Sequence, residues 1–225
     1  MNPVLRGSAA HVFVESLDAP ELSAEDEHHL RRVLRIRDID AITVGDGAGG
    51  WIVANLLSTG VSIGSPPTFE PAPPRAAVLS AIPKGDRPEW IVQKLTEVGV
   101  TSMGFIHCAR SVVQWDATRR LRQMERLRRV AREAAMQSRR LWLPQLCDVV
   151  PFEEAIKSIN GAIADPDGDD LDAVVDTVLV GPEGGFTEGE LGAAARRVSL
   201  SANVLRVETA ALTAAILLTQ RHERT

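Results

Sequence analysis

The sequence predicts two domains, a small N-terminal β-barrel with one helix and an α/β domain with a mostly parallel sheet. A chain of 225 residues is long enough for two small domains. Strand-like runs dominate its first part, and strand and helix patterns alternate in the rest. Between these parts, residues 65–75 contain five prolines, which exclude a regular helix or a central strand. We therefore place the boundary in this stiff connector and expect domains at 1–70 and 71–225.

The first domain should contain several strands and one helix. The strand signals are "HVFVES", "DAITVG" and "WIVANLLS", in which apolar and β-branched residues alternate or run together. The helix is expected over 25–35, with Ser23 as its N-cap and Asp26 three residues later. Its narrow apolar face should be formed by Leu30, Val33 and Leu34.

The second domain should alternate strands with helices. The strand signals, in order, are "AAVLSAI", "MGFIHC", "GAIAD", "TVLVG" and "VLRV". Helices are expected at four places, 86–99, 117–139, 191–198 and 209–222. Two of them should begin with a capping box, Asp86 with Glu89 and Thr187 with Glu190. Such alternation is typical of a mostly parallel sheet covered by helices.

The distribution of charge matters more than its total. The formal net charge of −5 argues by itself against a nucleic-acid partner. However, the stretch from Arg119 to Arg140 holds nine arginines against Glu125 and Glu133, a local balance of +7 that leaves −12 for the rest of the chain. A patch of one sign on an acidic protein is more informative than the overall charge.

The helix expected over 117–139 carries this basic run. Its buried stripe should consist of Leu121, Met124, Leu127, Ala131 and Ala134. A different stripe is shared by Arg119, Arg122, Arg126 and Arg129. A solvated helix face would also place arginines there, but it would normally mix both signs. Solvation and phosphate contact both stay open for this stripe.

The compartment follows from what the sequence lacks. The N-terminal stretch has no apolar core of a secretory signal, and "TAALTAAILL" is only about half the length of a membrane span. Cys108 and Cys147 lie far apart without a CxxC pattern, which argues against a metal site or a disulfide framework. We expect a soluble cytoplasmic protein in which both cysteines are small core residues.

The stretch "GDGAGG", residues 45–50, matches a dinucleotide-binding pattern in letters only. That site needs a helix directly after the glycines, because the helix N-terminus holds the pyrophosphate. Here the strand-like "WIVANLLS" follows. A hairpin turn, in which glycines supply positive φ angles, explains the stretch better.

The stretch "GPEGGF", residues 181–186, predicts a ligand pocket. It follows the buried run "TVLV" and precedes a capped helix, and ligands of open α/β sheets bind at this carboxyl edge. Glycines there let backbone groups approach a ligand closely. The loops "SAIPKGDRPE" and "VLRVETAALTA" should reach the same edge. In the second loop, Arg206 and Glu208 could serve the site or form a surface ion pair of little consequence.

Two smaller features have competing interpretations. Arg110 and Ser111 follow a strand and could contact phosphate, or they could cap a helix or satisfy polar groups of the core. His28 and His29 are adjacent on a helix, where neighbouring side chains diverge and cannot easily share one metal ion. We expect these histidines to extend the basic surface of "HHLRRVLRIR".

Six motifs in order resemble the bacterial 16S ribosomal RNA (uridine-N3) methyltransferase family of the SPOUT superfamily. They are "HHLRRVLRIRDID" with "GDG", "AIPKGDRPEWIVQKLTEVGV", "RSVVQW", "AREAAMQSRR", "LVGPEGGFTEGEL" and "LRVETAALTA". The resemblance covers nearly the whole chain. Departures from the family pattern are Ala109, where an acidic residue is common, Val207, where threonine is common, and a missing glycine in "LSANVLRVETA".

The resemblance implies a PUA-like β-barrel, a parallel sheet with helices on both faces and a deep trefoil knot, a rare threaded topology. It also implies a homodimer that uses S-adenosylmethionine. By resemblance, the cofactor contacts are Ile82, Pro83, Val180, Gly181, Pro182, Glu183, Gly184, Gly185, Phe186, Leu205, Thr209 and Ala210. The catalytic residues would be Arg206 and Glu208. The RNA contacts would be Arg31, Arg32, Arg35, Lys84, Arg110, Arg119, Arg122, Arg126 and Arg129.

The implied reaction methylates N3 of a uridine in 16S ribosomal RNA, in an assembled small-subunit particle. We expect no metal, because a sulfonium is already an activated methyl donor. Arg206 would stabilise the charge that develops on uracil, and Glu208 would orient Arg206, complement the sulfonium or act as base. Two other functions stay open. One is methylation of transfer RNA or of a ribose 2′-hydroxyl, and the other is a non-catalytic RNA-binding module.

Overall fold

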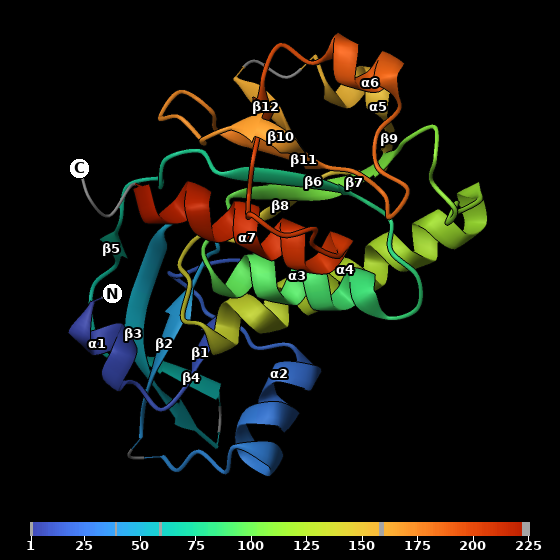
Figure 1. Cartoon of the computed structure of the whole chain (residues 1–225). Coiled ribbons are helices and arrows are strands. Elements are labelled where there is room, and N and C mark those ends of the chain that lie inside the picture. Colours follow the sequence, from blue (N-terminus) through green and yellow to red (C-terminus); the bar gives the residue numbers. More distant parts are fainter. Residues whose placement is uncertain (1, 39, 59, 158–159, 222–225) are drawn as a thin grey trace. The chain divides into compact units, whose positions relative to one another are not determined.

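The computed structural model describes residues 2–38, 40–58, 60–157 and 160–221. Figure 1 shows the order of its helices and strands. The chain divides into two compact units, residues 1–73 with 132–143 and residues 74–131 with 144–225. The sequence-based boundary lies near the first division. It did not assign 132–143 to the N-terminal unit, because that segment continues a helix begun in the other unit.

The first unit contains a five-stranded sheet in which β1 pairs parallel with β2 and the other pairs are antiparallel. Its elements are α1 (Pro3–Gly7), β1 (His11–Phe13), α2 (Ala24–His28), the π-helix η1 (His29–Val33), β2 (Ala41–Gly45), β3 (Gly50–Leu57), β4 (Gly60–Ile63) and β5 (Thr68–Phe69). All three predicted strands are present, whereas closure into a barrel stays a prediction. Ser23 caps α2 as expected, because its Oγ accepts from the Asp26 amide at 3.0 Å.

The predicted apolar face of the first helix is only partly correct. Leu30 is fully buried, but Val33 and Leu34 are 59% and 46% exposed. The helix changes to a π-turn at His29, which rotates later side chains away from the positions that a regular α-helix would give them. Asp26 is buried and paired with Arg132 at 2.8 Å, so the core of this unit is completed by an ion pair.

The second unit contains a seven-stranded sheet in which every pair is parallel, as the alternating pattern predicts. The strand order is β12-β10-β11-β6-β7-β8, and β9 also pairs with β7. The strands are β6 (Ala77–Ala81), β7 (Ser102–His107), β8 (Gln145–Leu146), β9 (Val150–Pro151), β10 (Gly161–Asp169), β11 (Thr177–Val180) and β12 (Arg197–Val198). The helices are α3 (Arg87–Glu97), α4 (Ala117–Gln137), α5 (Phe152–Ala155), α6 (Glu188–Ala193) and α7 (Val207–Gln220).

Helices cover both faces of this sheet (Figure 1). Neighbouring residues of a strand point to opposite faces. Accordingly, Val178 belongs to the core cluster that includes residues of α3, α4 and α7, whereas Leu179 belongs to the cluster that includes Phe152 of α5 and Phe186. Helix α4 has residues in both units, since its last turns from Arg132 belong to the first unit.

Four local predictions are wrong. "VLRV" is not a strand, because the edge position beside β10 is taken by β12 and the residues after it form a loop. The helix expected over 191–198 covers 188–193 instead. Leu121 is 71% exposed, whereas the other four residues of its stripe are buried. Asp86 stands at the N-cap of α3 but makes no side-chain capping bond, so the predicted box is absent there.

The ends of the two long helices match the prediction closely. Helix α4 stops at Gln137, just before Arg139 adopts a φ of 57°, a left-handed conformation typical of a helix C-terminus. Helix α7 begins two residues earlier than expected, and its predicted last residue, His222, lies outside the described residues. None of the helices in the described ranges combines the length and hydropathy that a membrane crossing requires.

Candidate functional site

The candidate site lies at the carboxyl edge of the parallel sheet in the second unit. Because β6, β7 and β11 run parallel, the loops 82–86, 108–116 and 181–187 all leave the sheet at this edge. Helix α7 packs on β6 and β11. Two of the three loops expected to converge therefore leave neighbouring strands, and the third ends at the start of α7.

The "GPEGGF" loop is closed by the predicted capping box of α6. The Glu190 carboxylate accepts from the Thr187 amide at 2.7 Å, and the Thr187 hydroxyl accepts from the Glu190 amide at 3.3 Å. The same carboxylate accepts from the Ala109 amide at 2.9 Å, which ties in the loop after β7. Burial would raise the pKa of Glu190, but these bonds and the nearby Arg110 charge hold it below its ordinary value.

Arg110 braces this loop from the side. Its Nη1 donates to the carbonyl oxygens of Gly184 at 2.9 Å and Phe186 at 3.2 Å. The guanidinium predicted to contact RNA is thus engaged with protein backbone. Ser111 makes a local turn, since its Oγ accepts from the part-buried Cys108 amide at 2.9 Å, and it does not cap a helix through this bond.

The loop glycines have different surroundings. At Gly181, an added Cβ would lie 2.9 Å from the Phe186 ring, so a side chain there is excluded by packing. Gly185 has a φ of 69°, and an added Cβ would meet nothing within 4 Å. Phe186 packs on Phe152 with ring centroids 5.4 Å apart. Packing therefore fixes one end of the loop and leaves free space beside the Cα atom of Gly185.

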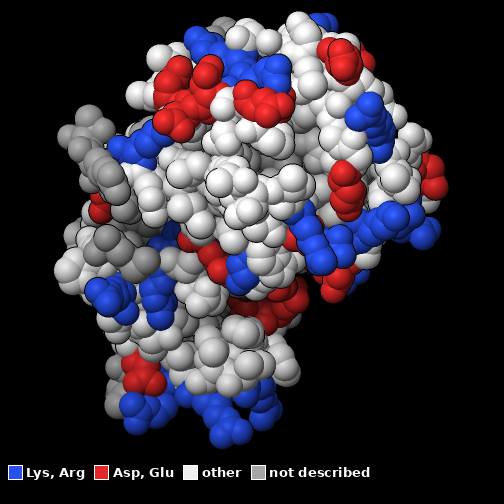
Figure 2. All heavy atoms as spheres, in the orientation of Figure 1, with Lys and Arg blue, Asp and Glu red and all other residues white. Residues whose placement is uncertain are grey.

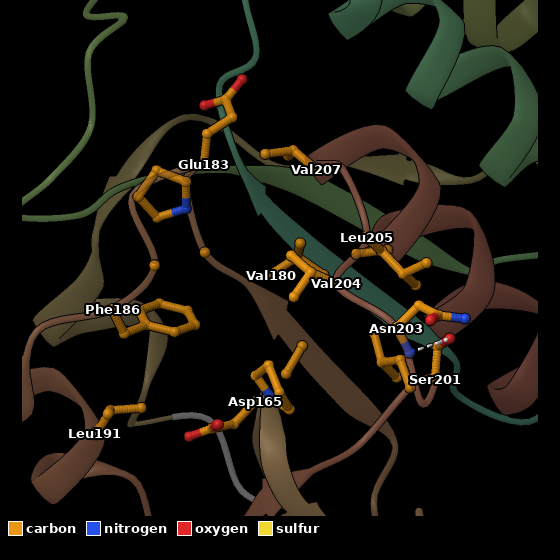
Figure 3. A pocket seen from close by; sticks show the side chains of 17 residues that line it. Asp165, Val180, Glu183, Phe186, Leu191, Ser201, Asn203, Val204, Leu205 and Val207 are labelled. Carbon is orange, nitrogen blue, oxygen red and sulfur yellow. Dashed lines mark hydrogen bonds between the residues drawn. The ribbon is translucent and has the colours of Figure 1, made fainter.

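A pocket of about 300 Å³ opens beside this loop. It is lined by Ala164, Asp165, Pro166, Val180, Gly181, Pro182, Glu183, Gly185, Phe186, Leu191, Leu200, Ser201, Asn203, Val204, Leu205, Val207 and Ala210. Figure 3 shows Phe186 and Leu191 on one side, Asn203 and Leu205 on the other, with Glu183 and Asp165 toward opposite ends. The lining is mostly apolar with a few polar groups, which is typical of a small-molecule site.

Eight of the twelve predicted cofactor residues line this pocket. They are Val180, Gly181, Pro182, Glu183, Gly185, Phe186, Leu205 and Ala210. Ile82, Pro83, Gly184 and Thr209 do not line it: the first two are buried, and Gly184 faces the Arg110 side chain.

Sequence reasoning missed the opposite wall. That wall comes mainly from the loop between β12 and α7, which contributes Leu200, Ser201, Asn203 and Val204. It also missed Asp165, whose side chain is 8% exposed and lies 2.6 Å from Arg197. Neither stretch carries a glycine-rich or capped motif. The one clue is the cluster of apolar residues in "VLRV", whose propensity predicts a strand.

The predicted catalytic residues stand at the start of α7, next to the pocket. Arg206 is the N-cap residue and is exposed, and it makes no ion pair with the described part of the chain. Glu208 is largely buried at 15% side-chain exposure, and its ion-pair partner is Arg87 at 3.6 Å. The alternative of a mutual pair between Arg206 and Glu208 is therefore wrong. Sequence reasoning did not single out Arg87.

The predicted RNA-binding arginines form two groups, one in each unit. On α4, Arg119, Arg122, Arg126 and Arg129 are all exposed, and Arg126 also pairs with Glu89 at 2.9 Å. Figure 2 shows Lys and Arg side chains gathered over the region that α4 occupies in Figure 1. Lys84 is exposed in the loop after β6.

In the first unit, Arg32 and Arg35 are exposed, whereas Arg31 is held by Glu27 at 2.9 Å and by the Leu57 carbonyl. His28 and His29 are exposed beside them. The cysteines differ from each other: Cys108 is buried, and burial raises the pKa of its thiol to about 12, but Cys147 is only half-buried.

Comparison with known proteins gives consistent matches. Residues 70–219 match the RNA methyltransferase domain family. The chain is 30% identical over 232 residues to ribosomal RNA small subunit methyltransferase E of Bacillus subtilis, with 88% of this chain and 89% of that protein covered. It is 28% identical to the protein of the same name from Mycobacterium bovis, with 86% and 83% covered.

Solved structures share the fold. A methyltransferase of Legionella pneumophila, with the cofactor SAM bound, matches with a TM-score of 0.79 and 26% identity over 94% of this chain and 97% of that chain. The ribosomal RNA small subunit methyltransferase E of Neisseria gonorrhoeae, bound to S-adenosyl methionine, matches with a TM-score of 0.76 and 24% identity over the same shares.

Proposed function

Because the chain belongs to the ribosomal RNA small subunit methyltransferase E family, we propose that it transfers a methyl group from S-adenosylmethionine to N3 of a uridine in 16S ribosomal RNA. The observation that carries this proposal is the pocket at the carboxyl edge of the sheet, directly beside Arg206 and Glu208. The exposed arginines of α4 belong to the same unit.

The residues of the pocket fit this cofactor. Apolar walls from Phe186, Leu191 and Leu205 suit a purine ring, and the backbone at Gly185 is free of side-chain cover. Carboxylates at Glu183 and Asp165 suit the cationic and hydroxyl-bearing parts of the molecule. When bound, S-adenosylmethionine supplies an electrophilic methyl group on a sulfonium. The protein's task is then to hold the methyl group and N3 in line.

The protein must also make uridine reactive. Neutral uridine carries a proton on N3, and its loss spreads negative charge onto the two flanking carbonyl oxygens. A cationic donor aimed at these oxygens lowers the barrier. Arg206 fits this role, because its side chain is exposed at the pocket edge and makes no ion pair with any described residue.

The pairing of Glu208 narrows its role. The carboxylate is held by Arg87 at 3.6 Å, so orientation of Arg206 is the weakest of its three possible roles. Two roles are left: complementing the charge of the sulfonium, or accepting the N3 proton. Its Oε2 is buried and has no hydrogen-bond partner among the described residues, so a ligand group could bind there.

The RNA would be held by the two groups of arginines. N3 lies on the Watson–Crick edge of uracil, so the base must be unpaired or extruded before it can react. We propose that two groups of side chains contact the RNA backbone. The group in the second unit is Arg119, Arg122, Arg126 and Arg129 on α4 with Lys84, and the group in the first unit is Arg31, Arg32 and Arg35. Arg110 is assigned to the loop that it braces, with RNA contact only as a second role.

Further properties follow from the family and complete the proposal. We infer that residues 1–70 form a PUA-like barrel, that residues 71–225 contain the trefoil knot, and that the enzyme is a homodimer in the cytoplasm. Its substrate would be the assembled small-subunit particle, because RNA readout by proteins favours unpaired, shaped elements.

Two measurements test the proposed function. Calorimetry with S-adenosylmethionine should detect one site per chain, and absence of binding would point to a non-catalytic RNA-binding module. Mapping modified nucleosides in ribosomal RNA from a deletion strain should then show loss of 3-methyluridine from 16S RNA. Loss of a transfer-RNA or ribose methylation instead would assign the protein a different substrate.

A further inference from the structure

Arg87 lies between two carboxylates that come from different parts of the site. It is the first residue of α3, directly after the loop that leaves β6. Its Nη1 is 3.9 Å from Oε1 of Glu183, and its Nε is 3.6 Å from Oε1 of Glu208. One guanidinium thus forms ion pairs with the "GPEGGF" loop and with the first turn of α7.

The three side chains belong to segments that are far apart in the sequence and meet only at this edge of the sheet. Glu183 lines the pocket and is 45% exposed, whereas Glu208 is only 15% exposed. Without the cation, two carboxylates would face the same small space and repel each other. A single positive charge between them removes that repulsion and favours one relative position of the two segments.

We propose that Arg87 is a positioning residue that sets Glu183 on the pocket wall and Glu208 on the catalytic side in one fixed arrangement. The inference rests on the proposed function, since it assigns how the two sides of the same site are held together. Both distances exceed the length of a hydrogen bond, so each contact is an ion pair.

The guanidinium is suited to this position. It is planar, carries donors on several nitrogens and can address two carboxylates at once, whereas a lysine ammonium is a single point charge on a flexible stem. If Arg87 only balanced the charge of the two carboxylates, a lysine at this position would serve equally well. A positioning role requires the arginine.

The test compares Arg87→Gln and Arg87→Lys with wild type in two measurements. Calorimetry gives the affinity for S-adenosylmethionine, and methylation of small-subunit particles gives kcat. We expect the glutamine variant to lose about three- to ten-fold in affinity. The kcat of both variants should fall on the order of ten-fold or more, because misplaced groups slow the reaction even when the cofactor binds.

Lys94→Gln is the matched control. Lys94 lies on the same helix as Arg87, pairs with Glu97 at 2.8 Å and does not line the pocket. The substitution therefore removes a cation from this helix without touching the site. This variant should keep wild-type affinity and kcat. Thermal melting of all variants shows whether a loss is a folding defect, and the lysine variant serves as the test if the glutamine variant does not fold.

A double-mutant cycle separates coupling from independent effects. Glu183→Gln in the Arg87→Gln background should cost less affinity than in wild type, because the pair is already broken. Additive losses within two-fold would overturn the proposal, as would full wild-type kcat in Arg87→Lys. If wild type binds the cofactor but leaves 16S RNA unmethylated, the proposed reaction is wrong, while the affinity cycle still decides the role of Arg87.

Discussion

Two glycine-rich stretches of the chain look alike in sequence but differ in surroundings. Residues 45–50 in the first unit match a nucleotide-binding pattern, yet they close an antiparallel hairpin between β2 and β3. At Gly49, with a φ of 94°, an added Cβ would lie 2.6 Å from the Trp142 ring. At Gly185 in the second unit, with a φ of 69°, an added Cβ would meet nothing within 4 Å.

The two turns differ in what lies next to them. In the hairpin, the Asp46 carboxylate accepts from the amides of Ala48 at 2.7 Å and Gly50 at 3.0 Å, and β3 follows at once. In the pocket loop, the Gly185 amide donates to the Pro182 carbonyl at 2.8 Å, a capped helix follows, and the loop lines a cavity. Glycine spacing therefore does not identify a binding loop; the element that follows the glycines does.

The sharpest test of this comparison concerns chemistry at the pocket edge. Arg206→Ala should lower the methylation rate about 10²- to 10³-fold, the usual cost of removing one donor to a developing charge. Cofactor affinity and melting temperature should stay near wild type, because Arg206 is exposed and makes no ion pair among the described residues. Arg196→Ala, another exposed arginine of this unit, is the control. Unchanged methylation with normal folding would remove Arg206 from the mechanism.

In the hairpin region, we expect an effect of pH on the free energy of unfolding rather than an effect on cofactor binding. His11 lies against its first glycine, and burial lowers the pKa of the His11 imidazole to about 4, with the Arg139 charge adding to the effect. The neutral form is therefore favoured in the folded state. Between pH 6.5 and about 4 the unfolded chain binds the extra proton, so the free energy of unfolding should fall by about 3 kcal/mol in this window.

Denaturant unfolding at pH 7 and pH 4.5 measures this loss, and an NMR titration of the histidines identifies its source. Glu190 beside the pocket acts at lower pH. Because its folded pKa is depressed, its contribution is present above the ordinary carboxyl pKa and is lost only as pH falls through the folded value. If the NMR titration gave His11 a pKa near the ordinary value of 6.5, it would contradict the assignment of this loss to His11.

Gly49→Ala tests the packed turn. The substitution adds a methyl group at positive φ and against the Trp142 ring, so it should destabilise the protein by about 2–3 kcal/mol. Cofactor affinity measured by calorimetry should not change. A loss of affinity without a loss of stability would mean that this turn, and not the pocket loop, binds the ligand.

Gly185→Ala tests the open loop. Positive φ alone should cost about 1 kcal/mol of stability, because the added methyl meets no neighbour. Cofactor affinity should fall about ten-fold, since the methyl takes space that a ligand would use. Affinity equal to wild type would remove the backbone near Gly185 from the binding site.

The smallest effect concerns the basic stripe of α4. Arg129→Gln should make the salt dependence of RNA affinity shallower by about 0.7–0.9 in the slope of log K against log salt, as expected for one lost phosphate contact. Arg6→Gln, an exposed arginine outside the proposed RNA surface, should leave the slope unchanged. Equal slopes for both variants would leave the stripe as a solvated helix face.

Much of the candidate site could be predicted from local patterns. The strand "TVLV", the capping box at Thr187 and the glycines between them mark one wall of the pocket, because each is a short-range signal. The opposite wall could not be predicted. Residues 204–207, "VLRV", look like a strand by propensity, but β12 already occupies the sheet edge, so Val204 and Leu205 line the pocket from a loop.

The sequence also could not predict which apolar side chains of the helices are exposed. Leu121 continues a correct apolar stripe past the part of α4 that packs, and Val33 and Leu34 follow a π-turn that no periodicity indicates. In both helices the apolar spacing predicts burial, but Leu121 lies beyond the packed part of α4 and the π-turn changes the direction of Val33 and Leu34.

By itself, the sequence determined strands β6, β7, β10 and β11 and helices α3, α4 and α7 of the second unit, the parallel sheet and the position of the glycine loop, since these depend on residues near one another. Only the tertiary structure decided which side chains share the site. Arg87, Glu183 and Glu208 are separated by more of the chain than any local signal spans, and they meet because parallel strands end at one edge. Likewise, Arg110 braces the loop through carbonyl oxygens, which are present at every residue and therefore leave no mark in the sequence.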